Sequence, residues 1–167
     1  MRKVTIDDVD IEPNPLDVHS VRRPVSRALG TEHFAMNYFE LKPGESFSGG
    51  LHTHHDQEEV FYIQSGTATF DVADEPDSGA TESVTVDAGE VIRFPAGQYQ
   101  TGYNDDDRDE PVVGFALGAP ASKHDWSEIE AAIPCQACGE ETGHGMSLTA
   151  EGDFEFTCGE CGTVFSF

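Results

Sequence analysis

The chain of 167 residues is long enough for one well-buried core with a small appendage, and its hydrophobic fraction of 37% excludes a disordered acidic chain. Its 32 Asp and Glu residues against nine Lys and Arg give a net charge of -23, which is typical of proteins from salt-loving organisms; a generic acidic protein is the alternative. No run reaches the ~18 consecutive apolar residues of a membrane span, and the N-terminus MRKVTIDDVD lacks the apolar region of a signal peptide. We therefore expect a cytoplasmic protein without a membrane partner.

Short strands separated by turns follow one another along most of the chain. Six segments rich in β-branched and aromatic residues alternate with turn material such as KPGES and NDDDRDEP: residues 33–41, 58–66, 66–73, 83–89, 90–97 and 111–118. This spacing predicts an all-β sandwich or barrel over residues 31–120. Residues 1–30 form an N-terminal arm with most of the basic groups, and we favour its pairing with the chain's own acidic surface over an anion site.

One helix is expected, in a linker over residues 121–134. Asp125 and Glu128 form a capping box, and an apolar stripe follows it before Pro134 (Trp126, Ile129 and Ile133). We place this helix near Asp125 to Ala132. Its tryptophan is interpreted as a packing anchor against the barrel.

The stretch LHTHHDQEEVFYIQSG, residues 51–66, concentrates histidines and carboxylates in front of an apolar run. On an extended chain His52 and His54 point to the same side while His55 points away, because side chains alternate along a strand. Glu59 begins the next apolar run, and Gly66 suits a tight turn. First-row divalent metals favour this mixture of imidazole and carboxylate, so the set indicates a metal site rather than a solvated strand end.

These residues resemble the cupin family. Its first motif is H-x-H, three or four residues, E, six residues and G, and His52, His54, Glu59 and Gly66 meet it with a gap of four residues. Its second motif is met by GEVIRFPAGQYQTGYN at every position except one, where the family places a third histidine ligand and this chain has Gln100. The glycine expected before the first histidine is also absent, since that position is Ser46. Two phrases, RALGTEHFAMNY and HHDQEEVFY, look like cupins of halophilic archaea.

The resemblance implies a double-stranded β-helix, a jelly-roll barrel, with a metal inside. His52, His54 and Glu59 would bind it, and Gln100 would complete the site with a weaker amide oxygen. Gln98 could replace Gln100 if the register slips. Fe(II) or Mn(II) is favoured, while Zn or Ni would also suit such ligands. Three states stay open: a metal bound with Gln100, a metal bound with water in that position, or a pocket that has lost its metal.

The C-terminal segment, residues 135–167, contains a second ligand set. CQACG and CGECG supply two Cys-x-x-Cys pairs separated by nineteen residues, a spacing that resembles a zinc ribbon (Cys135, Cys138, Cys158 and Cys161). Two disulfides or a rubredoxin-like iron site are the alternatives. His144 is interpreted as a residue of a solvated loop. A segment of about 30 residues buries too little surface to fold alone, so the metal would supply its folding energy while the barrel melts independently.

The leading hypothesis for function is a metal-dependent cupin enzyme, of dioxygenase or isomerase type, that acts on a small organic molecule. The alternative is a non-catalytic sensor or adaptor whose barrel binds a small ligand and whose ribbon contacts a partner protein. Nucleic-acid binding is disfavoured, because the segment from Pro134 onward has no Lys or Arg to neutralise phosphate. A homodimer is expected only by analogy with other cupins.

Overall fold

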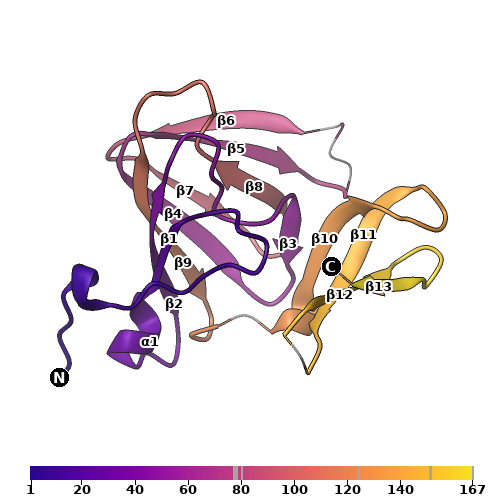
Figure 1. Ribbon diagram of the computed structural model, residues 1–167, viewed down its shortest axis with the longest axis horizontal. Coiled ribbons are helices and arrows are strands. Elements are labelled where there is room, and N and C mark those ends of the chain that lie inside the picture. The colour runs from indigo at the N-terminus through magenta and orange to yellow at the C-terminus, as the bar shows by residue number, and fades with distance from the viewer. Residues whose placement is uncertain (77–78, 80, 124, 151, 167) are drawn as a thin grey trace.

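Two antiparallel sheets enclose a phenylalanine-rich core in the computed structural model, which describes residues 1–76, 79, 81–123, 125–150 and 152–166 (Figure 1). The first sheet has the order β1 (Val21–Pro24), β2 (Ala35–Leu41), β9 (Val112–Ala119), β4 (Glu58–Ser65) and β7 (Val91–Phe94). The second has the order β13 (Val164–Ser166), β12 (Phe154–Cys158), β11 (Glu141–Leu148), β10 (Ile129–Pro134), β3 (His52–His54), β8 (Tyr99–Tyr103), β5 (Thr67–Ala73) and β6 (Glu82–Asp87). The predicted all-β class is confirmed.

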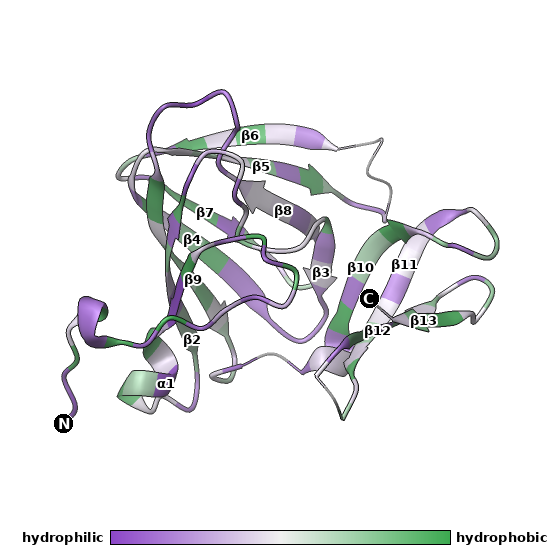
Figure 2. Ribbon diagram, viewed as in Figure 1, coloured by the Kyte–Doolittle hydropathy of each residue, from purple (hydrophilic) through white to green (hydrophobic). Residues whose placement is uncertain are grey.

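The core lies where the inward faces of the two sheets meet. Its largest cluster combines aromatic rings with aliphatic side chains such as Leu41 and Ile63, both 0% exposed. Phe70 packs against Phe61 at 4.9 Å between ring centroids and against Phe47 at 5.8 Å. Apolar residues thus gather on the strands, whereas the loop between β8 and β9 is hydrophilic (Figure 2). Alternation of inward apolar and outward polar positions explains why these segments form a two-layer barrel.

Gly66 makes the tight turn that was predicted for it. The residue joins β4 to β5 with a φ of 77°, in the left-handed region that favours glycine. A Cβ atom here would lie 2.5 Å from the carbonyl oxygen of Pro111. The turn therefore depends on the missing side chain both for its conformation and for the close approach of β9.

The helix predicted near Asp125 to Ala132 is wrong beyond its first turn. Asp125 does cap a turn, accepting a hydrogen bond from the Ser127 N–H at 3.0 Å, but only the 3-10 helix η3 (Trp126–Glu128) follows. The chain then continues as β10, which pairs with β3 on one side and β11 on the other. Ala131 and Ala132 are both buried and belong to different apolar clusters, so β10 is covered on both faces and its pairing with β3 overrides the helical capping signal.

The C-terminal strands extend the barrel's sheet instead of forming a detached ribbon. β10, β11, β12 and β13 follow β3 in one continuous sheet, and a small cluster of Ala131, Phe154 and Phe156 fills their inner side. His144 lies on β11 with 0% exposure, so its placement in a solvated loop is wrong. The burial follows from its position between strands β10 and β12, which cover it.

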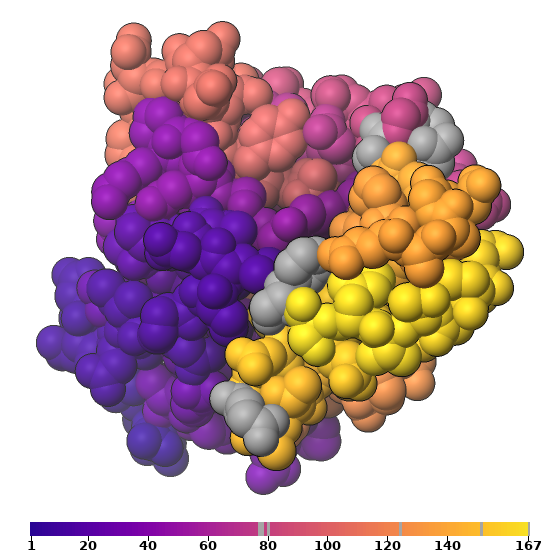
Figure 3. Space-filling view, turned by 45° about the vertical axis from the view of Figure 1, so that its right-hand side comes forward, coloured from indigo at the N-terminus to yellow at the C-terminus, as the bar shows by residue number. Residues whose placement is uncertain are grey.

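The N-terminal arm contains a 3-10 helix η1 (Ile6–Asp8), β1 and a short helix α1 (Val25–Leu29). Arg22 and Arg27 both form ion pairs with Glu12, which belongs to the same arm. The arm and the C-terminal strands lie on the same face of the molecule, one on either side (Figure 3). Within the described residues, no helix is long and apolar enough to cross a membrane.

Candidate functional site

The strand β3 presents two imidazoles to the barrel interior. His52 and His54 lie together with Glu59, and one ligand atom from each of the three lies within 4.8 Å of the others. His55 points the other way, as predicted, with a 45% exposed side chain that contacts Glu130. His52 Nδ1 lies 2.9 Å from the Gly50 carbonyl oxygen, which fixes the proton on Nδ1 and directs the Nε2 lone pair into the cluster.

Glu59 from β4 and Gln100 from β8 complete the cluster. Gln100 Nε2 donates to Glu59 Oε2 at 2.8 Å and lies 3.4 Å from His52 Nε2, while His54 Nε2 is 3.7 Å from the same Glu59 oxygen. Gln100 pairs directly with His52 in the register of β3 and β8 and is 2% exposed. Gln98 lies in the turn before β8. The structure thus brings together the four predicted residues, with Gln100 and not Gln98 facing the histidines.

The electrostatics of this cluster fit a divalent cation. Burial raises the pKa of Glu59 to about 7, partly offset by the hydrogen bond from Gln100, and burial lowers the pKa of His52. Gln100 Oε1 is buried without a hydrogen-bond partner. An amide that turned this oxygen inward would offer it beside two imidazoles and a carboxylate, a donor set that suits first-row metals. The residues present therefore fit a bound metal.

Asn104, the last residue of the second motif, has a structural role. Its side chain is 1% exposed and donates to the carbonyl oxygens of Leu41 at 3.0 Å and Glu110 at 2.9 Å. These bonds tie the end of β8 to the end of β2 and to the loop before β9. The residue is buried away from the cluster and holds the strands that place Gln100.

The four cysteines form a second cluster at the far end of the same sheet. All four are free, which does not support the disulfide alternative, and their sulfur atoms lie within 4.8 Å of one another. The Cys135–Cys161 and Cys138–Cys158 sulfur distances are 3.7 and 4.0 Å. A tetrahedron with zinc–sulfur bonds of about 2.3 Å has edges of about 3.8 Å, so these distances fit one four-coordinate metal.

Backbone amides surround the thiols, as expected for two knuckles. Gly139 and Gly162 adopt left-handed φ angles of 79° and 70°, and their N–H groups donate to the carbonyl oxygens of Cys135 and Cys158. Hydrogen bonds from the backbone of Cys138 and Ala137 lower the pKa of Cys135 to about 5, with a smaller contribution from the His144 ring. A lowered pKa favours the thiolate, the form that binds metals.

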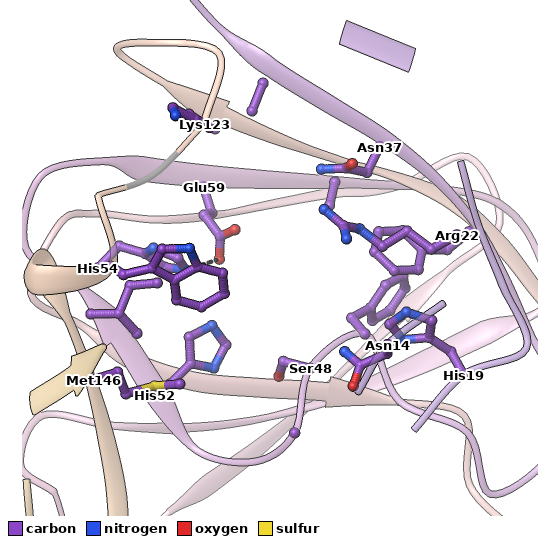
Figure 4. Close-up of a pocket in the computed structure, with 18 of the residues that line it drawn as sticks. Asn14, His19, Arg22, Asn37, Ser48, His52, His54, Glu59, Lys123 and Met146 are labelled. Atoms are coloured by element: carbon purple, nitrogen blue, oxygen red, sulfur yellow. Dashed lines mark ion pairs between the residues drawn. The ribbon is translucent and has the colours of Figure 1, made fainter. Parts of the chain in front are cut away.

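A cavity of about 760 Å³ opens beside the histidine cluster (Figure 4). Its wall includes His52, His54, Glu59 and Gln100, side chains of the N-terminal arm, and side chains of η3, β11 and β12. Sequence reasoning missed Arg22 and Met146 as cavity residues, since both come from segments expected to lie outside the barrel. The only signal available was the concentration of basic residues in an otherwise acidic chain.

Comparison with known proteins agrees with this architecture. A family model described as the cupin domain matches residues 37–113. A sugar phosphate isomerase of the cupin superfamily from Silicibacter pomeroyi is 19% identical, with 98% of this chain and 97% of that chain covered and a TM-score of 0.63. A cupin protein from Bacteroides fragilis is 16% identical over 74% of this chain and 87% of its own, with a TM-score of 0.54.

A third similar structure is that of an enzyme with a different activity. Oxalate decarboxylase from Lactobacillus farciminis, in a formate complex, is 19% identical over 71% of this chain and 33% of its own, with a TM-score of 0.55. A search of curated proteins finds no match. At these identities the likeness shows the fold alone, and the differing activities of these proteins mean that function has to be argued from the site.

Proposed function

We propose, because residues 37–113 match the cupin domain model, that this chain is a cupin and a metal-dependent enzyme acting on a small organic molecule. His52, His54 and Glu59 would hold the metal, with Gln100 as a weak fourth ligand. The observation that carries the proposal is the position of this cluster: four converging polar groups form part of the wall of a cavity large enough for a small molecule.

The donor set favours Fe(II) or Mn(II) in the barrel. Two imidazoles and one carboxylate leave coordination positions open, and an amide oxygen is a poorer donor than a third imidazole to Zn or Ni. When bound, such a metal acts as a Lewis acid that anchors and polarises an oxygen of the substrate. Isomerase-type and dioxygenase-type reactions both suit this chemistry.

The chain's own residues prepare the site in three ways. Gly50 orients the His52 ring through its carbonyl oxygen, and Gln100 holds the Glu59 carboxylate through its amide N–H. Burial keeps water from most of the cluster, since His54 and Gln100 are 7% and 2% exposed. Burial also gives Glu59 a pKa near neutrality, so in the absence of a cation this carboxyl group can hold a proton.

The four-cysteine cluster is proposed to bind structural zinc. Four cysteines already complete a tetrahedron, and neither Cys135 nor Cys158, which are 3% and 2% exposed, leaves room for a substrate. An iron site of the same ligand set is the alternative. Metal analysis per chain distinguishes the two, and visible absorption gives a second readout, because iron in four thiolates absorbs visible light and zinc does not.

Matched histidine variants test the barrel site. His52→Gln and Glu59→Gln should lose the barrel metal and keep the thiolate metal, whereas His55→Gln, on the same segment but pointing outward, should keep both. Nitric oxide added to the Fe(II)-loaded wild type should give the EPR signal of an iron–nitrosyl complex if a coordination position is open. Equal metal content in all three variants would refute the assignment, and an absent nitrosyl signal would contradict an open, reactive site.

A further inference from the structure

The charge balance of the cavity is the reverse of that of the chain. The whole sequence has nine basic residues against 32 acidic ones. Among the described residues, the cavity wall has three basic side chains, Arg22, Arg27 and Lys123, against only Glu12 and Glu59. A third of the chain's basic residues thus line this one cavity. Of the two carboxylates in the cavity wall, Glu59 belongs to the proposed metal site. Basic side chains concentrated in the wall of one cavity of an otherwise acidic protein favour an anionic ligand there.

The basic groups at the arm side of the cavity are incompletely neutralised. Glu12 is the ion-pair partner of Arg22, at 3.1 Å, and of Arg27 as well, so one carboxylate serves two guanidinium groups. Arg22 keeps a side chain that is 26% exposed. In Figure 4 the Arg22 guanidinium and the Asn37 amide point into the cavity from the side opposite His52 and Glu59. A planar guanidinium beside an amide is suited to a carboxylate or phosphate oxygen.

The C-terminal strands give the same cavity an apolar wall. Trp126, Met146 and Phe154 contribute to its lining, as do His52 and His54 (Figure 4). Trp126 packs edge-on against Phe154 at 5.3 Å, which holds the indole in place. An occupant that reaches from Arg22 to the histidines can therefore lay a hydrophobic face against these side chains.

We infer that the cavity binds a small amphipathic anion. Its carboxylate or phosphate group contacts Arg22 and Asn37, its apolar body packs on Trp126 and Met146, and a polar group at the other end lies at His52, His54 and Glu59. The last placement rests on the proposed function, whereas the anion subsite rests on the basic side chains alone.

Three small probes test the anion subsite by calorimetry on the full chain loaded with Mn(II): phenylphosphonate, benzoate and neutral benzyl alcohol. At least one of the two anions should bind more tightly than benzyl alcohol by about tenfold or more, as expected for a charge-assisted hydrogen bond. The preferred anion identifies the head group. Benzyl alcohol binding as tightly as both anions would overturn the inference.

Charge-matched variants locate the subsite. Arg22→Gln should remove the preference for the anion, and Arg93→Gln, which removes an exposed guanidinium paired with Glu58 outside the cavity, should keep it. Glu12→Gln should strengthen anion binding because it removes the competing carboxylate. If Arg22→Gln fails to fold, Asn37→Leu, which removes the amide beside Arg22, should weaken the anion by a severalfold factor and serves as the second test. Retention of the full preference in these two variants would overturn the inference.

Metal content measured on the same samples separates this inference from the proposed function. The Arg22→Gln variant should bind Mn(II) as the wild type does, since Arg22 is not a metal ligand. Anion preference without barrel metal would leave the subsite standing and refute the proposed function. Metal bound in the barrel without a preference for the anion would overturn the inferred subsite and leave the proposed metal site standing.

Discussion

Loss of one exposed thiolate should weaken metal binding in the barrel, although the two clusters share no residue. Cys138→Ser removes a thiolate from an exposed position, so it disturbs packing less than a change at Cys135 or Cys158. Structural zinc contributes about 10 kcal/mol to the folding of such segments. The two buried phenylalanines of the C-terminal cluster contribute about 5 kcal/mol together. The metal is the larger contribution, and without it β11, β12 and β13 should lose their order.

The disturbance should reach β3 through β10. Three residue pairs join β10 to β3, whereas β8 joins it through the single pair His52 and Gln100. Two backbone hydrogen bonds flank the first ladder, His55 N–H to Glu128 O at 2.8 Å and Ala132 N–H to Leu51 O at 2.9 Å. At about 1 kcal/mol each, their loss costs about 2 kcal/mol, which is about a 30-fold weaker barrel metal site. This predicted coupling runs against the expectation that the barrel melts independently, and the experiment below decides between them.

The assay is a Mn(II) titration followed by EPR, with hydrogen exchange reporting on the strands. Cys138→Ser should show faster exchange in β11 to β13 and weaker Mn(II) binding, and Leu148→Ser, an exposed change in β11, should show neither. Faster exchange in the C-terminal strands with unchanged Mn(II) affinity would refute the coupling through β10.

Three further changes probe single residues. Gln100→His should tighten Mn(II) and Zn(II) binding by about tenfold, because imidazole is a stronger donor than an amide oxygen, whereas Gln100→Ala should not. Equal affinities in metal titrations of the wild type and both variants would mean that residue 100 does not bind the metal. Burial lowers the pKa of His19 below 6.5, so the folded state binds fewer protons there and the free energy of unfolding should fall as the pH drops through 6.5. His19→Gln should reduce this loss of stability in denaturant titrations above and below that pH. A midpoint of 6.5 or higher in an NMR titration of His19 would contradict the prediction. Gly66→Ala should destabilise the fold by at least ~2 kcal/mol in thermal unfolding, whereas Gly145→Ala, with open space around its Cβ position, should change it little.

The local patterns predicted the barrel and the ligand cluster because both depend on short spacings. His52 and His54 share a face through strand alternation, and Gly66 occupies the turn that its spacing from Glu59 required. Expected segments such as 58–66 and 66–73 correspond to β4 and β5 within a residue or two.

Features that depend on distant pairing could not be predicted in the same way. The segment after Asp125 has a capping residue and an apolar stripe, and only the free edge of β3 decides that it becomes a strand. His144 is buried because β10 and β12 flank it, which no local pattern states. Arg22 reaches the cavity because β1 pairs with β2, bringing the arm across the barrel opening.

The pairing of β3 with β10 also has a consequence for self-association. A three-residue strand at the end of a sheet would present unpaired N–H and C=O groups, a ready template for a strand from another copy. Here β10 covers that edge of β3, and the sheet ends instead at β13. The C-terminal segment therefore protects the edge of β3, and in a chain cut after Ala119 this edge, with the histidines proposed to bind metal, would be open to aggregation.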